Sequence, residues 1–244
     1  MNFKQSEILL NEEISPSIYK MVVIEEADIK PGQFYMLKST KGYLQRPISI
    51  CEKENDKLTF LYAVVGEGTK GFTEMREGEK VTLTGPLGNG FNLDFKVKRL
   101  AVIGGGIGVA PMLQVAKEAK RKNVAEEINF YAGFRDEIYL DKEIEKYVDN
   151  LKITTNTGKY GHKGFVTEIF KPEEYDMVLC CGPEVMMKAV VEMCKKKNTE
   201  VFVSMEKHMA CGVGACLVCT CKTKDGNKRT CKDGPVFNGE YVEF

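Results

Sequence analysis

Four cysteines lie within eleven residues near the end of the chain, and a fifth follows ten residues later. The first three are spaced Cys211-x4-Cys216-x2-Cys219, and eleven residues separate Cys219 from Cys231. Plant-type [2Fe-2S] clusters are held by four thiolates in the arrangement C-x4-C-x2-C…C. The spacing therefore predicts a [2Fe-2S] cluster ligated by Cys211, Cys216, Cys219 and Cys231.

Two features of the same stretch refine this prediction. Cys221 lies two residues after Cys219, and so short a spacing is uncommon for two ligands of one cluster, so Cys221 is interpreted as a neighbour. Gly212 and Gly214 tolerate positive φ, which lets a tight loop aim its backbone N–H groups at the cluster. Hydrogen bonds of that kind raise a cluster's reduction potential.

A structural zinc site is the alternative for these cysteines. Zinc also accepts four thiolates, but its ligands usually form two short C-x2-C pairs, and only one such pair is present. A Rieske centre needs two histidine ligands, and His162 and His208 stand in no C-x-H pattern. His208 is expected to be a surface side chain.

A run of glycines marks a second candidate site. Four glycines in five positions follow the apolar run at 100–103: Gly104, Gly105, Gly106 and Gly108. Glycine lets the main chain approach a phosphate closely, and the helix that follows favours negative charge at its start. The run is not G-x-G-x-x-G, so an ordinary Rossmann dehydrogenase is not indicated. A glycine-rich turn without a ligand is the alternative.

Two shorter motifs and a turn carry weaker signals. Read alone, the run from Arg46 to Ser49 is an arginine at a strand edge before a proline. The stretch from Gly66 to Gly71 fits either a phosphate-facing turn or a plain loop. A Cys-Gly-Pro turn at Cys181 follows a predicted strand.

The first of these motifs lies among short extended segments. Six strands, separated by Pro-Gly, Gly and Asn-Asp turns, are predicted at 7–10, 19–24, 33–37, 48–51, 58–65 and 80–84. This spacing of strands and breakers is typical of a small antiparallel barrel.

From Arg99 onward, predicted strands alternate with helices. The strands are at 100–103, 127–132, 152–155, 177–181 and 201–205, and the helices at 112–122, 141–150, 166–170 and 183–197. Such alternation indicates a parallel sheet covered on both faces. The fold class is therefore multidomain, β followed by α/β: an antiparallel β-barrel at 1–96, a Rossmann-like α/β domain at 97–204 and a small cysteine module at 205–244.

Composition limits the possible partners and compartment. Lysine plus arginine equals aspartate plus glutamate at 35 each, without a long block of one sign, so no nucleic-acid partner is expected. No stretch approaches the ~20 apolar residues that span a bilayer, and the N-terminus lacks the apolar run of a signal peptide. A cytoplasmic protein is expected, in which nine cysteines indicate metal or redox chemistry rather than disulfides.

Taken in order, these motifs resemble the ferredoxin-NADP reductase superfamily: a barrel with Arg-Pro-x-Ser, a GGGIGVAP loop from strand to helix, and Cys-Gly-Pro at a strand end. The C-terminal MACGVGACLVCTCK and CKDGPVF resemble the electron-transfer subunits of dihydroorotate dehydrogenase B, an NAD-linked bacterial enzyme of pyrimidine (UMP) biosynthesis. The resemblance spans the whole chain. It implies an oxidoreductase component that binds FAD in the barrel and NAD(H) as co-substrate in the α/β domain. It further implies an FMN-containing catalytic partner, with two of each chain in a heterotetramer.

The resemblance also implies roles for individual residues. Arg46 would fork onto the FAD pyrophosphate, a task that guanidinium geometry suits, and Ser49 would place its hydroxyl near the flavin N5. Cys181 would lie near the nicotinamide, Cys180 would pack into the sheet, and Phe244 would not shield the flavin. The further contacts implied are Pro47, Ile48, Leu61, Tyr62, Ala63, Gly68 and Thr69 for FAD, and Gly104, Gly105, Gly106, Gly108, Gly182 and Pro183 for NAD(H).

The expected order of electron transfer is NADH, FAD, cluster and the partner's flavin. NADH gives up a hydride and a cluster accepts single electrons, so a flavin, which exchanges both, must stand between them. Two other functions stay open: the small subunit of a ferredoxin-NADP oxidoreductase or sulfide dehydrogenase-like complex, and a zinc-stabilised, non-catalytic nucleotide-binding module. The sequence does not decide between NADH and NADPH, and recognition of dihydroorotate is expected in the other subunit.

Overall fold

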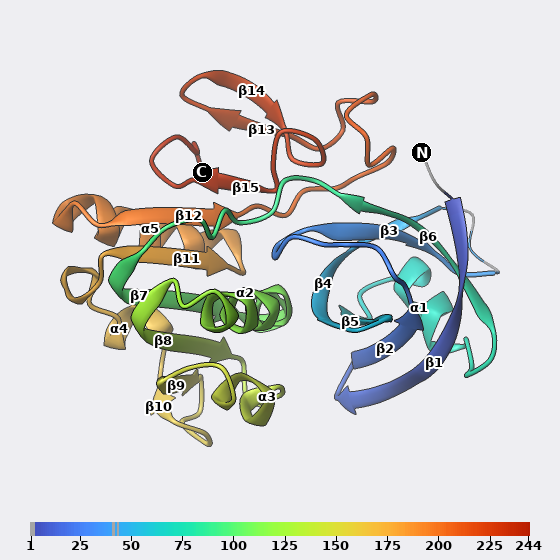
Figure 1. Ribbon diagram of the computed structural model, residues 1–244, viewed down its shortest axis with the longest axis horizontal. Coiled ribbons are helices and arrows are strands. Elements are labelled where there is room, and N and C mark those ends of the chain that lie inside the picture. Colours follow the sequence, from blue (N-terminus) through green and yellow to red (C-terminus); the bar gives the residue numbers. More distant parts are fainter. Residues whose placement is uncertain (1–2, 41, 43) are drawn as a thin grey trace.

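The computed structural model describes residues 3–40, 42 and 44–244. Its first half is a closed antiparallel barrel with the strand order β1-β2-β5-β4-β3-β6 (Figure 1). The strands are β1 (Phe3–Ser15), β2 (Ile18–Ile24), β3 (Phe34–Lys38), β4 (Arg46–Glu54), β5 (Lys57–Ala63) and β6 (Lys80–Leu87). The short helix α1 (Glu67–Thr73) connects β5 to β6 and occupies the stretch that the sequence left as a turn or a loop.

Strand β4 faces two different cores. Ile48 and Ile50 point into the barrel core, as the two-residue period of a strand requires. A bulge then leaves Cys51 as the extra residue of β4 opposite β5. The Cys51 side chain packs into the core of the second half of the molecule. The barrel and the α/β half therefore meet along β4.

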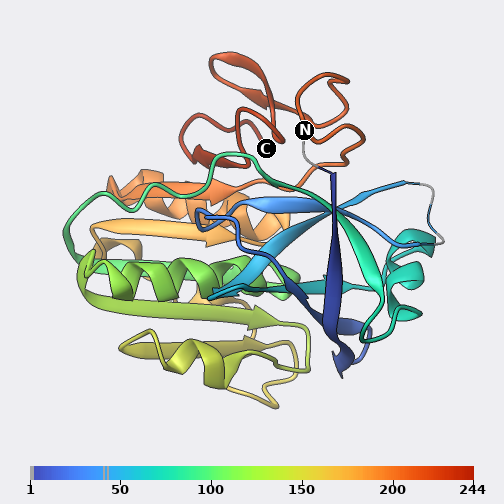
Figure 2. The ribbon, with the colours of Figure 1, turned by 45° about the vertical axis from the view of Figure 1, so that its right-hand side comes forward.

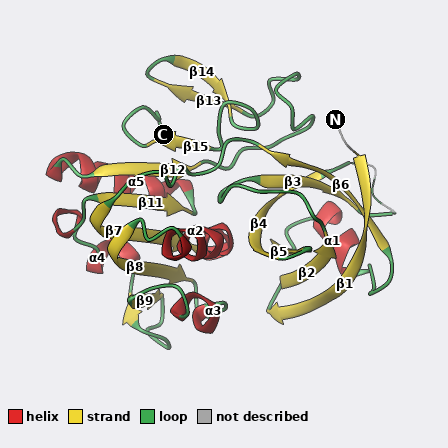
Figure 3. Cartoon of the chain, viewed as in Figure 1, coloured by secondary structure: helices red, strands yellow, loops and turns green. Residues whose placement is uncertain are grey.

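The second half is built on a twisted sheet of seven strands among the described residues, in the order β10-β9-β8-β7-β11-β12-β15 (Figures 1 and 3). All neighbouring pairs are parallel except β12 with β15. The strands are β7 (Val97–Gly105), β8 (Ala125–Phe134), β9 (Asn150–Thr155), β10 (His162–Lys163), β11 (Met177–Cys181), β12 (Glu200–Ser204) and β15 (Val236–Asn238). The helices are η1 (Gly106–Gly108), α2 (Val109–Arg121), α3 (Asp141–Glu145), α4 (Val166–Ile169), η2 (Pro172–Glu174) and α5 (Glu184–Lys197).

Alternate residues of β7 serve the two faces of this sheet. Leu100 and Val102 pack with α2, whereas Ala101 and Ile103 pack with α5. The expected Rossmann-like sheet with helices on both faces is thus confirmed. The helix expected over 141–150 is wrong in its second half, because α3 ends at Glu145 and β9 begins at Asn150. There the Asp149 carboxylate accepts the backbone N–H of Ile128, which ties this segment to the sheet.

The cysteine module lies over the junction of the barrel and the sheet in both views (Figures 1 and 2). It contains the hairpin of β13 (Thr220–Thr223) and β14 (Gly226–Arg229), and its β15 extends the large sheet by pairing with β12. On the other side, the Asn89 amide donates to the carbonyls of Lys232 and Asp233. The module is therefore fixed to both halves of the molecule. Among the described residues, no helix is long and apolar enough to cross a bilayer.

Candidate functional site

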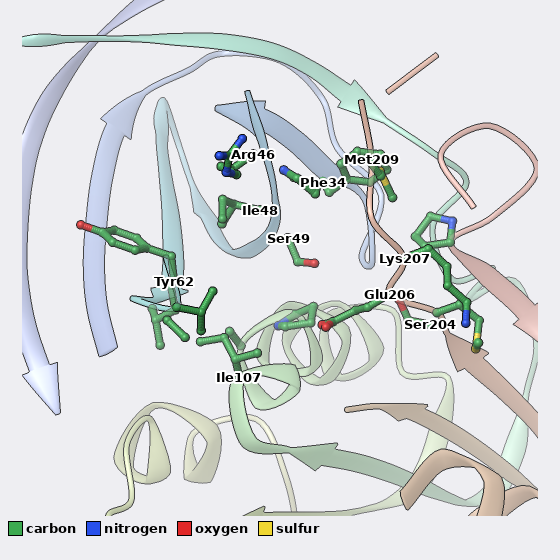
Figure 4. Close-up of a pocket in the computed structure, with 18 of the residues that line it drawn as sticks. Phe34, Arg46, Ile48, Ser49, Tyr62, Ile107, Ser204, Glu206, Lys207 and Met209 are labelled. Carbon is green, nitrogen blue, oxygen red and sulfur yellow. The ribbon is translucent and has the colours of Figure 1, made fainter. Parts of the chain in front are cut away.

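A cavity of about 840 Å³ lies between the barrel, the start of α2 and the segment that follows β12 (Figure 4). Its volume falls within the range usual for cofactor sites. The structure brings most of the residues expected at FAD together in its wall: Arg46, Pro47, Ile48, Ser49, Leu61, Tyr62, Ala63 and Thr69.

Strand β4 supplies the polar groups at one side of the cavity. Arg46 and Ser49 both reach the wall, and Figure 4 shows the Ser49 hydroxyl directed into the open space. Gly68 does not line the cavity, but it lies directly against the Arg46 guanidinium. A Cβ at position 68 would come within 2.5 Å of Arg46 Cζ and Nη2. Glycine at this position therefore leaves the room that the Arg46 side chain occupies.

Two of the residues expected at FAD, Tyr62 and Thr69, do not direct their polar side-chain groups into the cavity. The Tyr62 ring points away from the cavity into the barrel core, where its hydroxyl donates to Asn11 Oδ1 at 3.0 Å (Figure 4). The Thr69 hydroxyl accepts the backbone N–H of Val65 at 3.0 Å and donates to the Gly66 carbonyl at 3.1 Å. Tyr62 and Thr69 thus shape the wall by holding the backbone near it.

The glycine loop and the Cys-Gly-Pro turn lie side by side at the carboxyl ends of neighbouring strands. Gly104 pairs with Cys181 in the β7–β11 ladder. A Cβ on Gly105 would meet Pro183 at 3.0 Å, and one on Gly108 would meet the Cys181 backbone at 2.7 Å. These glycines are needed for the two loops to pack closely. Gly106 differs, because it has a φ of +53° and open space where its Cβ would be.

Strand order makes this edge of the sheet a binding position. The chain runs outward from β7 through β8 to β9 and then returns to β11 on the other side of β7. Ligands of open α/β sheets bind at the carboxyl ends of the strands where the order reverses. None of the seven residues expected at NAD(H) lines the cavity of Figure 4 itself: Gly104, Gly105, Gly106, Gly108, Cys181, Gly182 and Pro183. Ile107, within the loop, does line it.

The two adjacent cysteines of β11 face opposite sides of the sheet. Cys180 is fully buried on the α5 face, and its burial raises the pKa of its thiol. Cys181 is buried on the α2 face. Burial, and after it the charge of nearby Glu206, raise the pKa of the Cys181 thiol well above its usual value. Both cysteines are therefore neutral thiols, and Cys181 lies near a cavity residue.

Sequence reasoning missed the end of β12 and the segment that follows it. Ser204, Glu206, Lys207 and His208 all line the cavity, and Figure 4 places the Glu206 side chain opposite Ser49. Glu206 is exposed as a residue, but desolvation at the cavity raises the pKa of its carboxyl. The available signal was positional, because Glu206 follows the last predicted parallel strand and the carboxyl ends of such strands face the site. His208 is exposed, as expected.

The cysteine module brings its sulfurs together as two pairs. The backbone N–H of Cys216 donates to the Cys211 sulfur at 3.4 Å, and the backbone N–H of Cys231 donates to the Cys219 sulfur at 3.4 Å. Within the described residues, no group of three or more His, Cys, Asp or Glu side chains is arranged round one metal ion. Two thiol pairs suit the two irons of a [2Fe-2S] centre, each of which takes two protein thiolates. Cys221 belongs to neither pair and is buried in the β13–β14 hairpin.

Backbone N–H groups surround the sulfurs of Cys211 and Cys231. The Cys211 sulfur accepts N–H groups from Val213, Ala215 and Cys216 at 3.3 to 3.5 Å. Gly214 donates to the Cys231 sulfur at 3.1 Å. Burial opposes ionisation of Cys211, but the N–H donors outweigh it and lower its pKa to about 6. The donors are thus arranged for thiolate ligands, and Gly212 and Gly214 have positive φ as the loop requires.

An apolar contact connects the cavity to this module. Phe34 and Met209 line the cavity, and both pack in one cluster with Cys219 and Cys231. Cys219 and Cys231 are each only 2 % exposed, whereas Cys216 is exposed on the surface. One thiol pair therefore faces the cavity wall and the other faces outward.

A barrel and an α/β domain with a cavity at their junction, joined to a cysteine module, define an electron-transferring oxidoreductase of the ferredoxin reductase type. Residues 206–243 match the iron-sulfur cluster binding domain of dihydroorotate dehydrogenase B, and residues 102–192 match the oxidoreductase NAD-binding domain. The chain belongs to the family of electron transfer subunits of dihydroorotate dehydrogenase B (NAD(+)).

Relatives that match over nearly their whole length support this assignment. The chain is 57 % identical to the subunit of that name from Clostridium perfringens, over 100 % of this chain and 99 % of the relative. It is 52 % identical to the one from Clostridium acetobutylicum, over 95 % and 94 % of the two chains. The predicted family, the electron-transfer function and the oxidoreductase class are thereby confirmed, and a catalytic partner subunit is implied.

Solved structures agree on the fold. An NADH-dependent reduced ferredoxin-NADP oxidoreductase, studied for flavin-based electron bifurcation, is 26 % identical with a TM-score of 0.88, covering 98 % of this chain and 90 % of its own. A ferredoxin NADP+ reductase from Neisseria gonorrhoeae, at 18 % identity and a TM-score of 0.62, covers 81 % and 92 %. The predicted cofactors, FAD, a [2Fe-2S] cluster and NAD(H), are those of this family and fold.

Proposed function

We propose that the cavity holds FAD and that the chain passes electrons between NAD(H) and an FMN-containing dihydroorotate dehydrogenase subunit, in pyrimidine biosynthesis, by way of a [2Fe-2S] cluster. The observation that carries this proposal is the composition of the cavity wall. One cavity touches Ser49 of the barrel, the start of α2 at Ala110, and Phe34 and Met209, which pack on Cys219 and Cys231. Bound FAD supplies the exchange between hydride and single-electron transfer.

Arg46 and Ser49 are the proposed polar contacts of FAD. The Arg46 guanidinium lies at the wall beside α1, and its donors suit a bidentate bond to the pyrophosphate. Ser49 has its hydroxyl directed into the cavity, where it would donate a hydrogen bond near the flavin N5. Pro47, Ile48, Leu61, Tyr62, Ala63, Gly68 and Thr69 complete the proposed FAD site through wall contacts and, at Gly68, through space for Arg46.

The proposed NAD(H) site is the adjoining edge of the sheet. Gly106 presents an open backbone there, and the proposed pyrophosphate contacts run from Gly104 to Gly108. The turn from Cys181 to Pro183 packs against this loop and would lie beside the nicotinamide. The closeness of Cys181 to the cavity residue Glu206 supports this placement. Glu206 is added as a cavity residue between the two sites, with a carboxyl pKa that desolvation raises.

The proposed cluster ligands are Cys211, Cys216, Cys219 and Cys231. Their two pairs and their N–H donors support this set, and the position of Cys221 within the hairpin supports leaving it out. Electrons leave toward the catalytic subunit at the exposed tip of the loop. Cys216 lies there beside Leu217 and Val218, which are 61 % and 54 % exposed. Large exposed apolar side chains of this kind mark an interaction surface.

Three broader assignments belong to the same proposal. The functional units are 1–96, 97–204 and 205–244, which is supported by the end of β6 at Leu87, the start of β7 at Val97 and the end of β12 at Ser204. The assembly contains two of each chain. The protein works in the cytoplasm, where reducing conditions keep its nine free cysteines as thiols or ligands.

Purification of the native complex tests the function as a whole. The expected complex is brown, contains FAD, FMN, iron and sulfide, and converts dihydroorotate to orotate with reduction of NAD+. The dithionite-reduced form of this chain is expected to give the electron paramagnetic resonance signal of a [2Fe-2S] centre. A colourless protein with stoichiometric zinc, no iron and no flavin would refute the proposal and return the function to a non-catalytic nucleotide-binding module.

A further inference from the structure

The ends of α2 and β4 that lie away from the cavity are joined by a group of polar contacts. The Lys117 ammonium on α2 donates to Glu52 Oε1 at 2.7 Å, to Glu54 Oε1 at 3.2 Å and to the Lys53 carbonyl at 3.2 Å. One turn earlier on α2, Gln114 Oε1 accepts the backbone N–H of Lys53 at 2.8 Å. A single lysine thus has three acceptors on one strand of the other domain.

Apart from the bond to Glu54, whose side chain is 62 % exposed, these contacts are sheltered from water. The side chains of Lys117 and Glu52 are only 21 % and 17 % exposed, and Gln114 is 5 % exposed. The Tyr147 ring covers the ammonium at 5.6 Å, and its hydroxyl donates to Glu52 at 3.4 Å. Burial disfavours the charge of Lys117, yet the bonds to Glu52 and Glu54 hold its pKa above the usual value. Sheltered ion pairs are screened less by salt than surface pairs.

The same two elements form opposite walls of the cavity at their other ends. Ser49 is three residues before Glu52 on β4, which corresponds to at most about 10 Å of strand, because the bulge at Cys51 shortens this span. Ala110, which lines the cavity, is seven residues before Lys117 on α2, which also corresponds to about 10 Å. The distance between the walls at the cavity is therefore controlled by how α2 and β4 are joined about 10 Å away.

We propose that Lys117, with Glu52 as its main partner, is a positioning residue for hydride transfer, because it clamps the NAD-binding domain to the FAD-binding barrel at the spacing that brings the nicotinamide to the flavin. The apolar contact at the bulge is not directional enough for this task, since Cys51 only fills space in the core shared with α2. Three hydrogen bonds from one ammonium fix both distance and register. The inference rests on the proposed function, because it requires FAD in the cavity and NAD(H) at the adjoining loop.

The test is anaerobic single-turnover reduction of the FAD-loaded full-length protein by NADH, followed by flavin absorbance. Lys117→Met is expected to lower the limiting rate at least roughly tenfold, because a misplacement of ~1 Å can slow an oriented reaction by ~100-fold. The apparent affinity for NADH and the FAD content are expected to stay within about twofold of wild type. The long-wavelength charge-transfer absorbance between flavin and nicotinamide should weaken in parallel, which a loss of stability alone would not produce. Lys117→Arg keeps the charge and is expected to recover most of the rate.

A matched control lies on the same helix. Lys120 forms an exposed ion pair with Asp149 at 3.4 Å, within the NAD-binding domain, so Lys120→Met removes an equal charge without touching the clamp. Its reduction rate is expected to equal that of wild type. Glu52→Gln provides a second test that keeps the shape of the side chain, and it is expected to slow reduction in the same way.

The outcomes separate the clamp from the function on which it rests. Reduction of Lys117→Met and Glu52→Gln at the wild-type rate, or no more slowly than Lys120→Met, would overturn the clamp while leaving the function intact. A slower rate that is explained entirely by lost FAD or weaker NADH binding would overturn it as well. A wild-type protein whose FAD is not reduced by NADH would refute the proposed function and the clamp together.

Discussion

Gly68→Ala is a sharp test of the proposed FAD site, because the structure predicts opposite effects on folding and on binding. The new Cβ would lie within 2.5 Å of Arg46 Cζ and Nη2. These atoms are the far end of a flexible side chain, which donates a hydrogen bond to the Gln45 carbonyl at 3.1 Å. The guanidinium can therefore move aside at little expense to the fold. Gly68 lies within α1, where alanine favours the helix by up to about 1 kcal/mol.

Displacement of Arg46 is expected to weaken FAD binding strongly. Each hydrogen bond between the guanidinium and a phosphate contributes about 1.5 kcal/mol or more, so loss of a bidentate pair removes about 3 kcal/mol. This corresponds to a roughly 100-fold increase in the dissociation constant of FAD. The assay is FAD titration of the deflavinated protein by fluorescence quenching, together with thermal unfolding of the FAD-free form. The FAD-free variant should unfold at or slightly above the wild-type temperature.

Gly71→Ala is the matched control for this experiment. Gly71 lies in the same helix, and among the described residues its added Cβ would approach the Ser39 side chain, with the hydroxyl at 3.1 Å, so helix stabilisation is expected without a loss of FAD affinity. Equal FAD affinities for wild type and Gly68→Ala would refute the placement of the pyrophosphate at Arg46. A FAD-free Gly68→Ala protein that unfolds well below wild type would show instead that the fold, not the cofactor, needs this glycine.

Three further outcomes are expected. Cys231→Ser should abolish the reduced [2Fe-2S] paramagnetic signal while Cys221→Ser keeps it, and the reverse result would exchange their roles. Because burial raises the pKa of Glu206, the folded state holds this proton more tightly than the unfolded state, so its charged form destabilises the fold as the pH rises. Glu206→Gln should therefore raise the unfolding temperature of the FAD-free protein at pH 8 and not at pH 4, and a pH-independent difference would contradict this. The Arg229 guanidinium lowers the pKa of Asp233 to about 2. This interaction stabilises the folded state above the usual carboxyl pKa of about 4, and the stabilisation is lost as the pH falls toward 2. Asp233→Asn should destabilise the cysteine module by about 2 kcal/mol and speed loss of iron to a chelator, and unchanged iron retention would count against that ion pair.

Short-range sequence patterns were sufficient to predict the strands and helices and the chemistry of the cysteines. The two-residue period places Ile48 and Ile50 in the barrel core, and alternation of strands with helices gives the sheet, because both depend only on nearby residues. The spacing of Cys211, Cys216 and Cys219 is a property of one short loop. Where local signals were weak, the prediction was wrong or incomplete, as at α3, whose second half is replaced by a segment held by Asp149.

The sequence by itself determined the identity of the chemistry: four thiols at cluster spacing, a glycine-rich strand-to-helix loop and an Arg-Pro-x-Ser strand, with the family that combines them. Only the tertiary structure decided how these parts meet. It brings Glu206 opposite Ser49, packs Phe34 against Cys219 and Cys231, and places Lys117 on Glu52. These contacts join residues far apart in the chain, and they depend on the relative placement of three folded units. No short window of sequence contains that information, because the interfaces form between surfaces that are each complete only after their own unit has folded.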